Sequence, residues 1–105
     1  MNATTDALKN ESILLREDRD GIATLTLNRP EKYNALSTEL MGLIQDQLDH
    51  LANDTSIRVV IIAANGKAFC AGHDLREMDA DPSEEAIGAL FEQCSAMMVS
   101  LTRLP

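Results

Sequence analysis

Aromatic residues are scarce in this chain of 105 residues, which has no tryptophan, one tyrosine and two phenylalanines. Its core must therefore be built from aliphatic side chains and methionine. Cysteine is equally scarce, since only Cys70 and Cys94 occur. Two cysteines provide neither a disulfide framework nor the ligand spacing of a zinc site, so we expect buried free thiols, a reducing compartment and no metal.

Basic residues are also few, with 9 Lys and Arg against 17 Asp and Glu and a net charge of −8. A general nucleic-acid binder needs a basic surface to displace counterions, so we expect no nucleic-acid partner. No apolar run approaches the length that crosses a bilayer, and no membrane span is expected. Residues 1–12 are polar and lack the features of a signal or transit peptide, which predicts a flexible leader in a cytoplasmic protein.

Three short apolar segments are typical of strands. Residues 13–17 and 22–27 are separated by a turn at residues 18–21, which predicts an antiparallel hairpin whose second strand ends before Pro30. Residues 58–64 are apolar on both faces. We therefore expect this third strand to lie inside a parallel-type sheet that is covered on both sides.

The remaining periodic segments indicate helices. Ser37 or Thr38 is expected to cap an amphipathic helix that runs to about Asn53. A short helical turn is expected over residues 75–80, and Ser83 is expected to cap a second long helix with an apolar stripe between residues 86 and 101. The order strand, strand, helix, strand, loop, helix indicates an α/β fold.

The loop after the third strand carries the most specific signal. The apolar run closes at Asn65 and Gly66, and residues 67–75 follow with the sequence Lys-Ala-Phe-Cys-Ala-Gly-His-Asp-Leu. Small residues let the backbone approach a ligand, and exposed backbone N–H groups stabilise a developing negative charge. This segment closely resembles the Ala-Phe-x-Ala-Gly-x-Asp-Leu/Ile signature of the enoyl-CoA hydratase/isomerase (crotonase) superfamily.

A second match precedes the first in the chain. Residues 25–36, Leu-Thr-Leu-Asn-Arg-Pro-Glu-Lys-Tyr-Asn-Ala-Leu, resemble the family's strand followed by Asn-Arg-Pro-x-x-x-Asn-Ala-Leu. One helix and one strand are expected between the two matches, as in the family. The resemblance implies that residues 13–105 form the N-terminal part of a crotonase-like domain. Its fold would be the start of a spiral of ββα units, incomplete at the C-terminus.

The resemblance assigns one catalytic group in this chain. By its place in the signature, the backbone N–H of His73 is implied to be one of two oxyanion-hole donors that hold a CoA thioester oxygen. The family usually has a small residue there, so the imidazole adds bulk beside the substrate. One alternative is a loop histidine whose side chain points to solvent, and another is an acid–base role for the side chain.

The resemblance also implies that the two loops line a CoA groove. The expected groove residues are Arg29, Lys32, Asn34, Ala35, Leu36, Ala71, Gly72, His73, Asp74, Leu75 and Arg76. Arg29 and Lys32 are the local cations for the phosphates, and the alternative for either one is a simply solvated side chain. Asp74 and Leu75 have structural alternatives, as a helix cap and as a local core residue. The acidic residues between positions 77 and 85 are expected to be solvated.

The implied function is that of an acyl-CoA enzyme of the 2-enoyl-CoA hydratase or isomerase type, in fatty acid metabolism, with CoA as part of the substrate and no other cofactor. The family's second oxyanion donor and its acid–base carboxylates lie beyond the counterpart of Pro105. We therefore expect the isolated chain to be inactive, and a homo-trimer or hexamer for a full-length protein.

Two alternatives to an acyl-CoA enzyme stay open. The first is a non-catalytic fragment that binds CoA or forms oligomers. The second is a nucleotide-binding α/β domain unrelated to CoA, since Gly66 and Lys67 follow a strand. No glycine-rich phosphate loop with the needed spacing is present, which counts against the second alternative.

Overall fold

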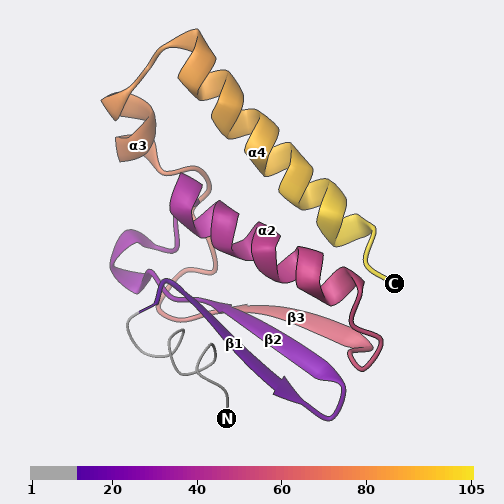
Figure 1. Cartoon of the computed structure of the whole chain (residues 1–105). Helices are drawn as coiled ribbons and strands as arrows, with labels where there is room; N and C mark the ends of the chain where they lie inside the picture. The colour runs from indigo at the N-terminus through magenta and orange to yellow at the C-terminus, as the bar shows by residue number, and fades with distance from the viewer. Residues whose placement is uncertain (1–11) are drawn as a thin grey trace.

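The computed structural model describes residues 12–105, so most of the predicted leader at residues 1–12 lies outside the described residues. Within this range a sheet, a helix packed on it and a second long helix lie one above the other (Figure 1). The elements are, in chain order, β1 (Leu14–Arg19), β2 (Ile22–Leu27), the 3-10 turn η1 (Pro30–Lys32), α2 (Thr38–Ala52), β3 (Val59–Ala64), α3 (Leu75–Ala80) and α4 (Glu84–Thr102). The α/β class expected from the sequence is confirmed.

Strands β1 and β2 form the expected antiparallel hairpin, in which Leu14 pairs with Leu27. The predicted turn was too long, because pairing continues to Arg19 opposite Ile22. Only Asp20 and Gly21 form the turn, both with positive φ, at 53° and 81°. Two consecutive positive-φ residues are typical of the tight turn whose twist matches that of paired strands.

Helix α2 covers one face of the sheet. The Ser37 hydroxyl accepts a hydrogen bond from the Leu40 backbone N–H at 3.1 Å, so Ser37 and not Thr38 is the N-cap. The apolar residues of this helix recur every three or four positions and pack in one cluster with Leu14 of β1 and alternate residues of β2. Together they form most of the core, with Leu14, Ala23, Leu25, Leu27, Leu40, Met41, Ile44, Leu48 and Leu51.

Strand β3 pairs in parallel with β2, as expected, but it is not covered on both sides. It lies at the edge of a sheet whose order is β1-β2-β3 within residues 12–105. Val60 and Ile62 face α2 and the core, whereas Val59 and Ile61 are 50% and 44% exposed. The prediction was wrong on this point. An apolar run indicates that both faces of a strand are suited to burial, but it does not indicate whether other elements of the chain cover both faces.

Helix α4 lies along α2 on the side away from the sheet (Figure 1). Ser83 caps it by accepting a hydrogen bond from the Ala86 backbone N–H at 3.1 Å. Its apolar stripe is wider than its contact with α2. Leu90 and Met97 are buried, while the exposed part of the stripe consists of Phe91, Met98 and Val99.

Candidate functional site: the paired loops at the ends of β2 and β3

The two sequence motifs meet in space at the carboxyl ends of the parallel strands β2 and β3. The Leu36 backbone N–H donates to the Gly72 carbonyl at 2.7 Å, and the Asp74 N–H donates to the Leu36 carbonyl at 2.9 Å. The Ala71 N–H donates to the Tyr33 carbonyl at 3.0 Å. In open α/β sheets this edge is where ligands bind. We call residues 28–36 the first loop and residues 65–74 the second loop.

The backbone N–H of His73 is not used by this pairing. His73 and Leu36 form a single parallel β-bridge, in which the Leu36 N–H donates to the Gly72 carbonyl and the Asp74 N–H donates to the Leu36 carbonyl. The Gly72 carbonyl points to the first loop, and the N–H of a trans peptide group points opposite to its carbonyl, so the His73 N–H is directed away from the first loop. Within residues 12–105 it has no hydrogen-bond acceptor. The His73 N–H is therefore a donor without a partner that is held in place by the hydrogen bonds of the Gly72 carbonyl and the Asp74 N–H.

The imidazole of His73 does not point to solvent. Its ring packs edge-to-face against Phe91 of α4, with ring centroids 5.0 Å apart and an interplanar angle of 85°. The Nε2 atom is buried and has no hydrogen-bond partner within the described part of the chain. The interpretation of His73 as a solvated loop histidine is thus wrong. The sequence had no pattern linking residue 73 to residue 91, because the contact depends on how the turn between α3 and α4 folds back.

Asn34 joins the two loops through its side chain. It is fully buried, with a φ of 55°, a left-handed conformation that asparagine tolerates better than most residues. Its Nδ2 donates to the carbonyls of Asn65 and Ala68 at 2.8 and 2.9 Å, and its Oδ1 accepts from the Arg29 N–H at 2.7 Å. Asn34 was predicted to line the CoA groove, and its side chain is committed to holding the two loops together.

Arg29 and Asp74 form a second link between the loops. The guanidinium donates to the Asp74 carboxylate at 3.0 Å and to the Ala35 carbonyl at 2.7 Å. Both side chains of the ion pair are only 14% exposed. Arg29 is therefore neither a simply solvated cation nor one whose charge is left unpaired for a phosphate, because its charge is already matched inside the fold.

The Asp74 carboxylate also caps α3. It accepts hydrogen bonds from the backbone N–H groups of Arg76 and Glu77 at 3.0 and 3.2 Å, which confirms the capping alternative. Burial alone would raise the pKa of Asp74. The bonds from Glu77, Arg29 and Arg76 outweigh burial, and the pKa lies below its ordinary value of 3.8. The carboxylate is thus held in its charged form.

The turn at Gly66 brings the second loop against the first. Gly66 has a φ of 96°, and a Cβ placed on it would lie 2.7 Å from the Cβ of Pro30. Only glycine permits both this conformation and this approach. The proline of one motif and the turn glycine of the other are therefore in direct contact.

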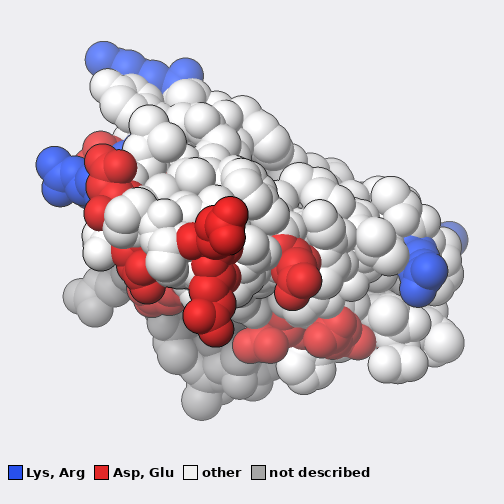
Figure 2. Space-filling model, turned by 90° about the horizontal axis from the view of Figure 1, so that it is seen from above, with Lys and Arg blue, Asp and Glu red and all other residues white. Residues whose placement is uncertain are grey.

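The other predicted groove residues lie at the surface near these links. Leu75 is 72% exposed, so the alternative that it is a local core residue is wrong. Ala71, Gly72 and Arg76 are also exposed, and Lys32 and Ala35 are partly buried. Figure 2 shows acidic side chains gathered on one face with basic ones at its margins. A phosphate-rich ligand therefore depends on the few local cations.

One acidic residue expected to be solvated has a defined partner. The Glu77 carboxylate accepts hydrogen bonds from the Thr38 backbone N–H at 2.7 Å and its hydroxyl at 2.9 Å. It thereby joins α3 to the first turn of α2. The spacing of 39 residues between them gave no local signal, although a carboxylate is the ordinary partner for the free N–H groups of a helix start.

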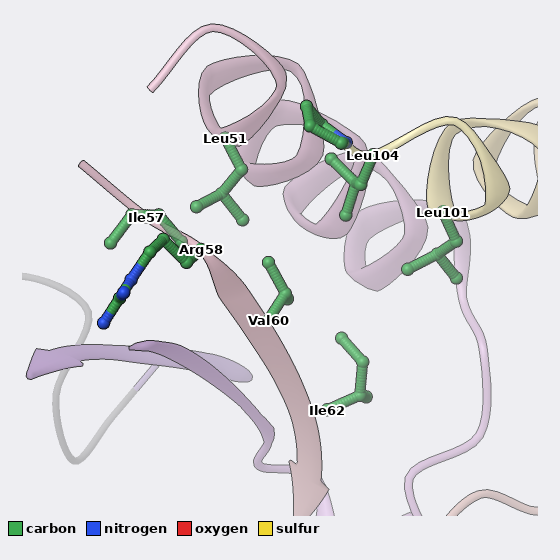
Figure 3. A pocket seen from close by; sticks show the side chains of 8 residues that line it. Leu51, Ile57, Arg58, Val60, Ile62, Leu101 and Leu104 are labelled. Carbon is green, nitrogen blue, oxygen red and sulfur yellow. The ribbon is translucent and has the colours of Figure 1, made fainter. Parts of the chain in front are cut away.

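A separate hollow of about 230 Å³ lies at the other end of the molecule. Figure 3 shows it between Val60 and Ile62 of β3, Leu51 at the end of α2, and Leu101 and Leu104 at the end of α4. Most of its lining side chains are apolar, and Arg58 also lines it. Residues 12–105 contain no cluster of three or more side chains suited to a metal ion, and none of their helices is long and apolar enough to span a membrane.

Comparison with known proteins shows the family and the fold of the chain. The profile of the enoyl-CoA hydratase/isomerase family matches residues 22–105. The solved structure of an enoyl-CoA hydratase from Mycobacterium smegmatis superposes with a TM-score of 0.88 at 49% identity, over 90% of this chain and 37% of that one. This likeness confirms the crotonase-type fold.

Two curated relatives show what share of a family member's length this chain spans. The human enoyl-CoA hydratase domain-containing protein 3, mitochondrial, is 34% identical over 82% of this chain and 28% of its own length. The 1,2-epoxyphenylacetyl-CoA isomerase of Escherichia coli is 36% identical over 70% of this chain and 28% of its own. The chain spans less than a third of the length of these two relatives, and it belongs to the enoyl-CoA hydratase/isomerase family.

Proposed function

We propose that the chain holds the thioester carbonyl of an acyl-CoA through the backbone N–H of His73. The observation that carries this proposal is the unpaired His73 N–H, which lies between the bonded Gly72 carbonyl and the bonded Asp74 N–H, at the strand ends where ligands of α/β sheets bind. Chemistry next to a thioester places negative charge on the carbonyl oxygen. A backbone donor that is already fixed stabilises this charge without reorganising, and one such donor lowers the barrier by about 3–4 kcal/mol.

The reaction type that fits best is hydration of a 2-enoyl-CoA or a shift of its double bond, within fatty acid metabolism. The family membership and the names of the relatives support an enzyme of this kind. The two carboxylates nearest to His73 in the chain, Asp74 and Glu77, are engaged by Arg29 and Thr38. Neither is available as the acid–base group, and we propose that the isolated chain binds thioesters without turning them over.

The CoA part of the substrate would lie across the two loops. The backbones of Asn34, Ala35 and Leu36 supply one wall and residues 71–75 the other. Since Arg29 is paired with Asp74, Lys32 and Arg76 are the cations proposed for the phosphates. CoA enters as part of the substrate, and no further cofactor is proposed.

Calorimetric titration of the chain with crotonyl-CoA and with free CoA tests this function. We expect crotonyl-CoA to bind more tightly, because only the thioester offers a carbonyl oxygen to the His73 N–H. A spectroscopic assay of the thioester in the same samples should show no turnover. Equal binding of the two ligands would contradict the proposed role of the N–H, and turnover would contradict the proposed inactivity.

The second candidate function is a non-catalytic, oligomer-forming unit. The exposed part of the α4 stripe, Phe91, Met98 and Val99, favours it, because contiguous exposed apolar surface is typical of interfaces. Homo-trimers or hexamers are proposed for the full-length protein, and association for this chain. Sedimentation at increasing concentration should show species heavier than a monomer, and a monomer throughout would exclude this candidate.

The cytoplasmic location stays a prediction that cell fractionation tests.

A further inference from the structure

The second loop begins with a dipeptide that has a chemistry of its own. Asn65 is followed by Gly66, the only asparagine–glycine pair in the sequence, and both residues are exposed. Glycine has no Cβ that would keep its backbone nitrogen away from the preceding side chain. The carboxamide of an asparagine in this context is therefore open to attack by the next backbone nitrogen.

This reaction needs no enzyme and no reactant other than water. The Gly66 backbone nitrogen loses its proton and forms a bond to Cγ of Asn65, while the bond from Cγ to Nδ2 breaks and Nδ2 leaves as ammonia. Water then opens the cyclic imide at either of its carbonyls. The product is an aspartate at position 65, or an isoaspartyl linkage in which the backbone runs through the side chain and is one methylene longer.

The paired loops hold Asn65 at three points. Its backbone N–H donates to the Leu27 carbonyl at 2.9 Å, and its carbonyl accepts from Nδ2 of Asn34 at 2.8 Å. Its own Nδ2 donates to Oδ1 of Asn28 at 3.0 Å. Closure of the imide requires Cγ to turn onto the Gly66 nitrogen, which these bonds oppose. The side chain of Asn65 is thus exposed to water but restrained from reacting while the loops are paired.

We propose that Asn65 is a site of spontaneous deamidation that is controlled by the pairing of the first and second loops. Exposed loops open locally without unfolding of the core, and a reaction of the opened state follows the population of that state. The proposal is independent of acyl-CoA binding.

The isoaspartyl product should be unable to restore the pairing. Its extra methylene displaces the carbonyl of residue 65 from Nδ2 of Asn34. Gly66 has no space to move towards the first loop, because a Cβ placed on it would already lie 2.7 Å from the Cβ of Pro30. Opening of the loops is reversible, and the reaction makes it permanent.

Peptide mapping of the whole chain during incubation at pH 8 measures the reaction. Trypsin releases residues 59–67 as one peptide, whose mass and charge change when Asn65 is deamidated. We expect conversion to be at least about tenfold slower in the folded chain than in the chain unfolded by urea, because the loops are mostly paired. Asn53 is the internal control in the same digest, since it is exposed but precedes Asp54, and it should stay intact.

Two variants distinguish opening of the loops from unfolding of the whole chain. Asn34→Ala removes the bonds to the carbonyls of Asn65 and Ala68, and should speed deamidation of the folded chain about tenfold. Leu51→Ala leaves a cavity at the C-terminal end of α2, away from the loops, and should destabilise the chain without changing the rate. Equal rates in the folded and unfolded chains, or equal effects of the two variants, would overturn the inference.

Hydrogen exchange in the unaltered chain covers the case in which Asn34→Ala does not fold. The amides of Ala71 and Asp74 pair the loops and should exchange faster than those of the central strand β2. Isoaspartyl chains, separated by chromatography, should lose the protection of the Ala71 amide. Loop amides that exchange only as slowly as β2, or an Ala71 amide that stays protected after the reaction, would contradict the proposal.

Discussion

Leu36 and His73 form a single parallel β-bridge between two loops that are far apart in the sequence. Its hydrogen bonds use the N–H groups of Leu36 and Asp74 and leave that of His73 free within the described chain. The loops are joined again by the side chain of Asn34 and by the ion pair of Arg29 with Asp74. The donor is therefore held in place by its neighbours, and predictions about those neighbours test the arrangement.

The ion pair predicts how stability depends on pH. The pKa of Asp74 is lowered in the folded chain, so the charged carboxylate contributes stability above its ordinary pKa of 3.8, and this contribution is lost as the pH falls through the lower folded value. Thermal unfolding between pH 6 and pH 2 should show this loss. Asp74→Asn should be less stable than the unaltered chain at pH 6, and the difference should shrink towards pH 2.

Asp79→Asn is the control for this prediction, because Asp79 follows Asp74 on α3 but is exposed. Its curve should run close to that of the unaltered chain at every pH. If Asp74→Asn and the unaltered chain kept the same difference in stability from pH 6 to pH 2, Asp74 would not be the group that responds.

Replacing Arg29 tests the same pair from the other side. Arg29→Ala leaves a largely buried carboxylate without its cation, and we expect a loss of about 2–3 kcal/mol in the free energy of unfolding. Arg19→Ala removes an ion pair with Asp20 in which both side chains are 87% exposed, so it should change stability by less than about 0.5 kcal/mol. Urea titration measures both, and similar losses for the two variants would show that burial of the pair is unimportant.

Asn34 should contribute more to the stability of the fold than the size of its side chain suggests. Asn34→Ala removes three hydrogen bonds of a fully buried residue and places alanine at a φ of 55°, and we expect a loss of about 2–4 kcal/mol. Asn53→Ala removes one long, exposed contact to the Asp49 carbonyl and should lose less than about 1 kcal/mol. Comparable losses in chemical unfolding would mean that Asn34 does not hold the loops together.

Alanine substitutions at three glycines distinguish the effect of backbone strain from that of steric crowding. Gly66→Ala combines a φ of 96° with a contact of 2.7 Å to Pro30, so it should lose about 2–4 kcal/mol. Gly72→Ala has a similar φ of 95° but nothing within 4 Å, and should lose only about 1–2 kcal/mol. Gly88→Ala lies in α4 with open space around it and should gain about 0.5–1 kcal/mol. A different order in thermal unfolding would contradict the packing of Gly66 on Pro30.

Local patterns were sufficient to predict most of the fold. The hairpin, the capped helix α2, the strand β3 and the long helix α4 follow from periodicity, turn residues and caps. What the patterns did not predict was which apolar surfaces would be left open. Ile61 and Phe91 are as hydrophobic as the buried residues of the same elements. Their exposure depends on which other parts of the structure pack against them.

The sequence motifs predicted which two loops form the candidate site. They did not predict the side-chain contacts within it. The motifs pointed to residues 28–36 and 65–75, which the structure brings together. The bonds of Asn34 to Ala68 and of Glu77 to Thr38 join residues 34 and 39 positions apart, where no local spacing rule applies. The burial of the His73 ring likewise depends on the path between α3 and α4. Long-range polar contacts of this kind are specified by the folded backbone.

The most direct measurement is the ¹H–¹⁵N resonance of the His73 backbone amide during titration with crotonyl-CoA, with free CoA as the reference. An N–H that donates to a thioester oxygen should shift downfield with crotonyl-CoA and far less with free CoA. The amides of Leu36 and Asp74, whose hydrogen bonds are already made, should shift much less. If the His73 amide did not respond to the thioester while other resonances reported binding, the central claim would be contradicted.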